Sequence, residues 1–337
     1  MPSAMSSLIH PITLLLIIFV GYGFKRFRIF GDSDYRVLQR VVFNLTLPAA
    51  IIVSFLNNPH DLSLLWVTLF GFVCGMIPIP ILYFASLHKP VSERAFLMLN
   101  GAGFNIGNFC FPVMQGMLGS ASLVPGAMFD MGNCVVVSAG SNLLTLRLLH
   151  IQPGKTLKEQ GAGDAPVLPK ITPKDKDARR LARIAAIKNI LKGFFTSVPF
   201  DCYLLMIVLM LTGVTLPGVV STVLEPFANA NGFCSMLMVG MLMDLPAGRS
   251  DVKQVLRVLA WRLPFAALFA AFAWFVLPFD ASIRKAVVML CFAPTAIFAT
   301  LFSDKVLGNA RMAGFCLSVT AILGMIALTA INFLIPA

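Results

Sequence analysis

The stretch Asn100-Gly-Ala-Gly-Phe-Asn-Ile-Gly-Asn-Phe-Cys-Phe-Pro-Val-Met-Gln-Gly116 decides the fold of this chain. It lies inside an apolar segment, yet it carries three Asn, three Gly and one Pro between Asn100 and Pro112. Gly and Pro weaken a helix, and side-chain amides need partners where water is absent. At membrane depth such a break is tolerated only where the freed backbone is buried in protein or lines a cavity. The stretch therefore indicates either the broken helix of a secondary transporter, with a substrate site at the break, or a kinked structural helix packed through small residues.

Composition indicates a membrane protein. Of 337 residues, 58% are hydrophobic and 12% are charged, and the mean hydropathy is +0.85. Soluble domains are about a quarter charged. We therefore predict an all-α polytopic membrane protein whose partner is the lipid bilayer. The net charge of +11 would suggest nucleic acid in a soluble protein, but the positive-inside rule explains it better, so no nucleic-acid partner is expected.

Cysteine and histidine give no sign of a metal or redox site. The seven Cys fall in apolar segments without a Cys-x-x-Cys pair, and the four His lie at segment ends or in loops. We expect neither disulfides, nor a metal, nor a cofactor. The first apolar run, Leu8 to Phe24, has its Lys and Arg after it. That order is opposite to a signal peptide and predicts a retained span.

Hydropathy predicts ten spans with a hydrophilic loop between the fifth and the sixth. Domains are expected at 1–149, 150–192 and 193–337: a five-helix repeat, a cytoplasmic basic loop and a second five-helix repeat. The spans are about Leu8–Phe24, Val37–Phe55, Leu62–Leu87, Arg94–Leu118, Leu123–Leu149, Phe194–Val214, Val219–Leu245, Val255–Leu277, Ile283–Phe302 and Met312–Ile335.

Loop charges predict the topology. The loops that follow spans one, three, five, seven and nine, with their flanks, hold 24 of the 26 Lys and Arg. The positive-inside rule places these loops in the cytoplasm and both termini outside. We expect the membrane to be the inner membrane of a bacterium. Within the central loop, Leu181, Ile184, Ile187 and Leu191 share one helical face. This pattern favours a basic amphipathic helix on the inner membrane surface over a solvated lead-in to the next span.

The two halves resemble each other. Five spans on each side of the central loop make the halves inverted relative to one another. Leu118-Gly-Ser-Ala121 and Leu307-Gly-Asn-Ala310 both end an irregular span, and extending this register places Asn105 opposite Pro294. Paired interruptions in corresponding spans are the strongest sequence indication of a carrier's binding site.

Five motifs carry a resemblance to a known family, and it covers essentially the whole chain. They are Arg40-Val-Val-Phe-Asn-Leu-Thr-Leu-Pro48, Phe104-Asn-Ile-Gly-Asn-Phe-Cys-Phe-Pro112, Ala127-Met-Phe-Asp-Met-Gly-Asn133, Val239-Gly-Met-Leu-Met-Asp-Leu245 and Ala293-Pro-Thr-Ala296. In their order and spacing they resemble the auxin efflux carrier superfamily, which includes plant PIN-FORMED carriers and bacterial permeases often labelled malonate transporters.

This resemblance implies ten transmembrane helices in two inverted five-helix repeats, similar to bile-acid/sodium symporters. Broken helices four and nine would cross near the bilayer centre. The implied substrates are small organic anions, carboxylates such as malonate or auxin-like acids, carried by alternating access. Two departures from the family pattern, Phe104 and Asp244, bear on the substrate more than on the fold.

The candidate substrate site contains no group suited to covalent catalysis, and we predict that the protein is not an enzyme. A carboxylate stripped of water needs hydrogen-bond donors, which broken helix ends and neutral amides supply. The predicted substrate-binding residues are Asn105, Asn108, Pro294, Thr295, Asn44 and Thr46. The predicted helix breaks are Gly107, Pro112 and Pro48.

Asp130 stands out among the carboxylates, and Asp201, at a similar depth from the cytoplasmic side, is a weaker candidate. Asp130 lies about 12 Å into span five at 1.5 Å per residue. An ionised carboxylate there is costly, so Asp130 is expected to be protonated, paired with Asn133 or facing water. We consider two roles for the pair: proton coupling, with H⁺ as a second partner, or a structural hydrogen bond.

Three functional classes are compatible with these features to different degrees. The favoured class is a carrier of a small organic anion. The alternative is a membrane-embedded receptor or regulatory subunit that binds a ligand without transporting it, with the basic loop as a docking site. An intramembrane enzyme is disfavoured because the paired-Asp and Ser/His signatures are missing. A second copy of the chain is also considered as a partner.

Overall fold

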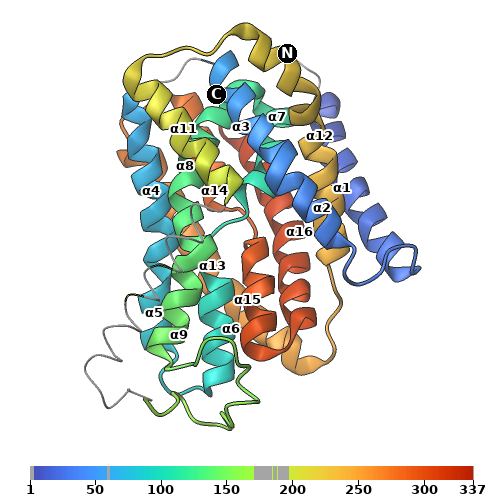
Figure 1. Ribbon diagram of the computed structural model, residues 1–337, viewed down its shortest axis with the longest axis vertical. Helices are drawn as coiled ribbons and strands as arrows, with labels where there is room; N and C mark the ends of the chain where they lie inside the picture. The colour runs from blue at the N-terminus through green and yellow to red at the C-terminus, as the bar shows by residue number, and fades with distance from the viewer. Residues whose placement is uncertain (1–3, 59–60, 171–183, 185–187, 189–196, 337) are drawn as a thin grey trace.

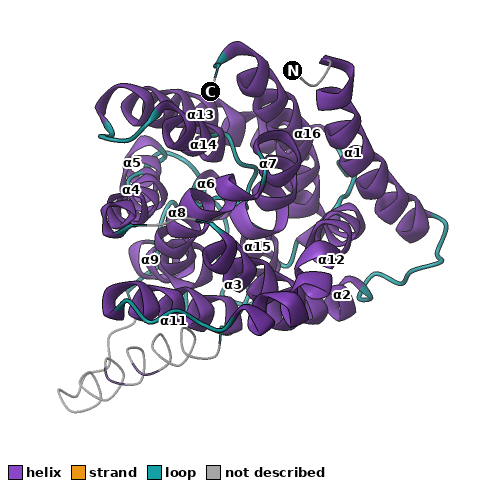
Figure 2. Ribbon diagram, turned by 90° about the horizontal axis from the view of Figure 1, so that it is seen from above, coloured by secondary structure: helices purple, strands orange, loops and turns teal. Residues whose placement is uncertain are grey.

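The computed structural model describes residues 4–58, 61–170, 184, 188 and 197–336, and for residues 4–7 the backbone alone. Throughout these ranges the regular structure is helical and no strand forms (Figure 2). The predicted basic surface helix in 178–192 falls almost entirely outside the described residues.

The helices follow one another in an order that matches the predicted hydrophobic segments. In chain order they are α1 (Ala4–Arg26), α2 (Tyr35–Val41), α3 (Leu47–Asn57), α4 (Leu65–Met76), α5 (Pro78–Ala85), α6 (Val91–Gly101), α7 (Phe111–Leu118), α8 (Leu123–Val135), α9 (Ser141–Leu148), α11 (Val198–Thr212), α12 (Gly218–Leu242), α13 (Arg249–Val276), α14 (Ala281–Cys291), α15 (Ile297–Leu307) and α16 (Ala310–Leu334). Short π-helical turns join α2 to α3, precede α7 and join α8 to α9; they are Val42–Thr46, Ile106–Cys110 and Val136–Gly140.

Six helical segments in the described part of the chain are long and apolar enough to cross a membrane, so this is a polytopic membrane protein. The other predicted spans fall on α11, which has 15 residues, on α12, and on the interrupted pairs α6–α7 and α14–α15. The six segments are Leu8–Arg26, Tyr35–Asn57, Leu62–Ala85, Ser120–Leu148, Arg249–Val276 and Ala310–Leu334.

Two segments are interrupted, in the two spans where the sequence predicts irregularities, but the residues expected to break the helices lie elsewhere. The backbone leaves the helix at 102–105 and at 292–296. Gly107 lies after the first interruption in a π-helical turn, and Pro112 and Pro48 lie in the first turns of α7 and α3. The helix continues through both prolines because a π-helical turn precedes each of them, and the first α-helical turn tolerates Pro. The expectation of breaks at Gly107, Pro112 and Pro48 is therefore corrected.

The helices pack as two groups. In the first helix group, which consists of α1, α2, α3, α11 and α12, α12 packs along α1 and α3. The second helix group consists of α4–α9 and α13–α16; in it α4 packs along α8, and α13 packs along α6 and α14. Both ends of the chain lie at one end of the molecule, and the 149–170 segment lies at the other (Figure 1). We call this second end the loop end.

Glycine permits the closest approaches within each group. A methyl group added at Gly71 would collide with the Phe129 carbonyl, and one added at Gly132 would collide with the Thr68 carbonyl. In the first helix group, a methyl group added at Gly240 of α12 would collide with the Ile18 carbonyl of α1. Small residues at membrane helix interfaces allow such backbone contact, which strengthens van der Waals packing.

We expect Gly132→Val to separate α8 from α4 and to lower the thermal midpoint of the purified protein, because overpacking costs about 1–3 kcal/mol. Gly218→Val is the matched control, since nothing lies within 4 Å of a Cβ added at Gly218. Equal midpoints for the two variants would contradict the glycine contact.

Candidate functional site

The two interruptions meet in the interior. The backbone N–H of Asn105 donates a hydrogen bond to the carbonyl oxygen of Pro294 at 3.0 Å. Both residues are buried, and Asn105 has φ −90° and ψ 78°, outside the helical region. The predicted opposition of Asn105 and Pro294 is thus a direct contact. We call the region around this bond the crossing.

Neighbouring helices hold each interruption in place. Asn133 on α8 donates from its amide to the Phe104 carbonyl at 2.8 Å and accepts the Phe104 N–H at 2.9 Å. On the other side, Thr320 of α16 accepts the Thr295 N–H at 3.2 Å, and the two hydroxyl oxygens lie 3.1 Å apart. Extended backbone inside a membrane needs such replacement partners. In this structure Thr295 is bonded within the protein and fully buried.

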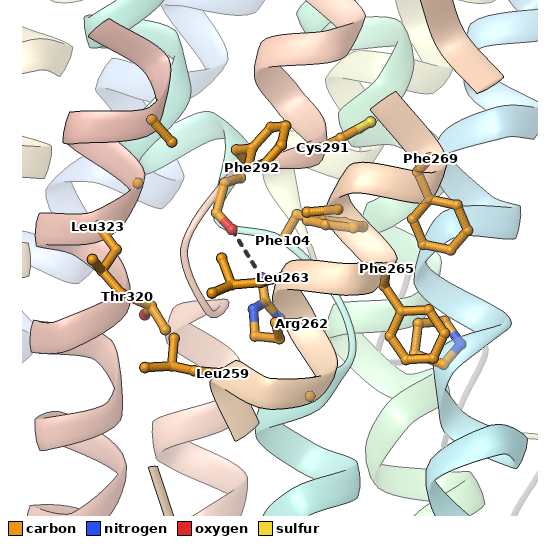
Figure 3. Close-up of a pocket in the computed structure, with 16 residues that line it drawn as sticks. Phe104, Leu259, Arg262, Leu263, Phe265, Phe269, Cys291, Phe292, Thr320 and Leu323 are labelled. Carbon is orange, nitrogen blue, oxygen red and sulfur yellow. Dashed lines mark hydrogen bonds between the residues drawn. The ribbon is translucent and has the colours of Figure 1, made fainter. Parts of the chain in front are cut away.

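Arg262 of α13 connects both interruptions. Its guanidinium donates to the carbonyl oxygens of Asn100 at 3.3 Å, Gly103 at 2.9 Å and Ala293 at 2.9 Å, and the last of these bonds is drawn in Figure 3. The side chain is 8% exposed, and its charged carbon lies 5.5 Å from the centre of the Phe104 ring. Within the described residues, no carboxylate forms an ion pair with it.

These three carbonyls belong to the places where α6 and α14 end. The last carbonyls of a helix lack intrahelical partners and carry partial negative charge, so a cation there is stabilised. The helical segments that restart at Ile106 and Ile297 begin at the same crossing. Their first N–H groups carry partial positive charge. The crossing thus brings together one guanidinium, bonded on the carbonyl side, and the N-terminal ends of two helical segments.

A cavity of about 40 Å³ lies beside the crossing. Its walls come from the first interruption, from α8, α11 and the start of α15, and it includes Asn105, Asn108, Asp130, Tyr203 and Ile297. Within the described residues, the Nδ2 of Asn105 and the Oδ1 of Asn108 have no hydrogen-bond partner, although both side chains are more than 90% buried. Buried polar atoms are normally paired, so unpaired ones beside a cavity indicate a place for a ligand.

Asp130 faces this cavity as part of a hydrogen-bonded network. Its two oxygens accept the Asn133 amide at 2.9 Å and the Tyr203 hydroxyl at 2.7 Å. The predicted pairing of Asp130 with Asn133 is present, and the same Asn133 amide also bonds the backbone at Phe104. A change at Asp130 can therefore be transmitted to the first interruption through one side chain.

Two residues predicted on span two lie elsewhere. Thr46 is buried and donates to the Oδ1 of Asn231 on α12 at 3.1 Å. Asn44 is exposed and bonds the carbonyl of Arg40, one turn earlier, at 2.8 Å. Neither lines the cavity; span two contributes Phe43 and Leu47 instead. The i−4 backbone bond is typical of Asn on a helix surface and satisfies its amide locally.

Sequence reasoning missed Arg262 and Tyr203. Arg262 was included among the flanking charges of a cytoplasmic loop, although it lies within the predicted span Val255–Leu277. An ionisable residue inside a span is a functional candidate by default, and that signal could have identified it. Tyr203 had no comparable signal, because one Tyr in an apolar segment is most often packing.

Apolar helices around a crossing of two interrupted segments define a membrane transporter, and comparison with known proteins agrees. A family model described as a membrane transport protein matches residues 7–332. The chain therefore belongs to this family, which is the auxin efflux carrier family that its motifs resemble. An uncharacterized transporter from Methanothermobacter thermautotrophicus is 23% identical over 323 residues, covering 94% of each chain.

We expect Arg262→Ala to destabilise the protein strongly, because each carbonyl left without a donor costs about 1–3 kcal/mol. Arg262→Lys keeps the charge but offers a narrower set of donors, so it should fall between alanine and wild type. Thermal unfolding in detergent measures both. Arg249→Ala, at the exposed start of the same helix, is the control; a midpoint for Arg262→Ala equal to the control would contradict the role of these bonds.

Proposed function

We propose that this membrane transporter carries small organic anions, carboxylates such as malonate or auxin-like acids, and binds them at the crossing. The observation that supports this most is the unpaired, buried amide donor of Asn105 at the edge of the cavity. A carboxylate leaving water needs such donors. Helix N-termini and Arg262 add positive potential without an ion-paired carboxylate among the described residues.

The proposed fold is the one expected for this family: ten transmembrane helices in two inverted five-helix repeats, with broken helices four (α6–α7) and nine (α14–α15). Support comes from the interruptions at corresponding positions and from the contact of Asn105 with Pro294. Alternating access would move the second helix group, which contains both interruptions, against the first. We further propose that the loop end faces the cytoplasm, on the strength of the loop charges, and that the membrane is the inner membrane of a bacterium, as for the bacterial permeases that the motifs resemble.

The residues that line the cavity are the ones we propose to contact substrate. Asn105 and Asn108 would contact the anion, with Asp130 and Tyr203 at its edge. Pro294 would act through its carbonyl bond to Asn105 rather than by touching substrate. Thr46 would position the Asn231 side chain, Thr295 would position the second interruption, and Asn44 would have no direct part. Asp130, with Asn133, would couple transport to a proton. A homodimer stays a prediction.

We expect Asn105→Ala to lower uptake of radiolabelled malonate into proteoliposomes by roughly 10–100-fold, the loss that follows removal of a hydrogen bond to a charged group worth about 1.5–3 kcal/mol. The matched control is Asn44→Ala, which removes the same amide from an exposed site. A panel of mono- and dicarboxylates covers the case in which malonate is not the substrate.

The panel also separates the competing functions. Measured binding of an anion without flux of any of them would favour the receptor over the carrier. Equal uptake by the Asn105→Ala and Asn44→Ala variants would contradict the proposal that substrate binds at the crossing.

We expect Asp130→Asn to abolish the pH dependence of uptake, because a side chain that cannot titrate cannot couple a proton. Tyr203→Phe removes the bond to Oδ2 and leaves the carboxyl in place, so it should shift the pH profile without flattening it. Uptake at external pH values from 5 to 8 measures both. Unchanged pH dependence in Asp130→Asn would rule out the coupling role.

A further inference from the structure

A second hollow lies on the same seam between the helix groups as the crossing cavity. It measures about 340 Å³ and opens near the loop end. One wall comes from the first helix group, through Tyr35 and Met241, and the other comes from α15, through Thr300 and Leu301. On α15, Phe298 lines the crossing cavity and Leu301 lines this hollow, so about one helical turn separates the two spaces.

An aromatic pair stands at that separation. Phe43, from the π-helical turn in the first helix group, meets Phe298 from the second helix group. Their ring centroids are 5.6 Å apart and their planes are inclined at 67°, the edge-to-face arrangement that aromatic rings prefer. Both rings line the crossing cavity. The contact thus spans the seam between the two groups and forms part of the cavity wall.

The hollow adjoins a wider cleft of about 630 Å³, with which it shares Lys25, Asp32, Asp244 and Arg311. The wider cleft is lined by the cations Lys25, Arg26, Arg28 and Arg311 and the carboxylates Asp32 and Asp244. One cation is neutralised, because Lys25 Nζ lies 3.0 Å from an oxygen of Asp244. The excess of cations attracts an anion to the mouth. The carboxylate of Asp304, which lines the narrower hollow, would repel an anion there.

We propose that substrate passes along this seam between the loop end and the crossing, and that Phe43 and Phe298 form the gate closing the crossing on that side. This inference rests on the proposed function for the identity of what passes. The gate itself depends only on the geometry of the seam. Because each ring belongs to a different helix group, relative movement of the groups separates them.

A cysteine already present reports on the gate. Cys134 of α8 lines the crossing cavity and is partly exposed. A small membrane-impermeant methanethiosulfonate reagent is applied to inside-out and right-side-out membrane vesicles, and labelling of Cys134 is followed by peptide mass spectrometry. In Phe43→Ala/Phe298→Ala, we expect labelling from the loop end to rise at least about tenfold, the change that a barrier lowered by about 1.4 kcal/mol produces.

The control is Phe96→Ala, which removes a fully buried ring of α6 that lines neither space. Labelling of this variant should match wild type, which excludes loosened folding as the cause. The proposal fails if the double variant labels no faster than wild type, or if it labels faster from the opposite end alone. Faster labelling of the double variant, together with no uptake of any carboxylate by the wild-type protein, would support the gate and contradict the proposed substrate class.

Discussion

Carbonyl groups that end a helix inside a membrane must find donors, and this constraint organises the crossing. The ends of α6 and α14 present their carbonyls to the same buried point, and Arg262 bonds both. Burying an unpaired guanidinium and burying unpaired carbonyls are each costly, and the hydrogen bonds between them reduce both costs. Asn133 and Thr320 complete the arrangement by bonding the backbone of the connecting segments.

This division of hydrogen bonds leaves the other side of the crossing free for a ligand. The carbonyl side is satisfied within the protein, whereas Asn105 and Asn108 keep unpaired polar atoms beside a small cavity. A cavity of about 40 Å³ is too small for a dicarboxylate. Binding of the proposed anion would therefore require the helix groups to part, and the side chains that would have to move are those of the seam. The carboxyl of Asp130 lies where the two groups meet, since Tyr203 belongs to the first and Asn133 to the second.

The sequence predicted the helical membrane fold, the two irregular segments and the contact of Asn105 with Pro294, because Gly, Pro and Asn in apolar surroundings are informative about the backbone. It misplaced the breaks, since a Pro such as Pro112 can begin a helical turn as readily as end one. Asn44 looked like a ligand residue because it stands beside Pro48, but its orientation depends on helix phase, which the π-helical turn shifts. Arg262 is overlooked when it is counted with the flanking charges of a cytoplasmic loop, although it lies as far into its predicted span as Asp130 lies into span five.

The glycine contacts bear on how the protein can move. Where Gly71 and Gly132 bring α4 and α8 together, backbone touches backbone, and no side chain is present that could change rotamer and let the helices slide. The same holds for α1 and α12 at Gly240. Each helix group thus contains a pair of helices in backbone contact, whereas the contact of Phe43 with Phe298 across the seam is made by side chains. In the proposed alternating access, each group would therefore move as a unit, and the rearrangement would fall on side-chain rotamers at the seam.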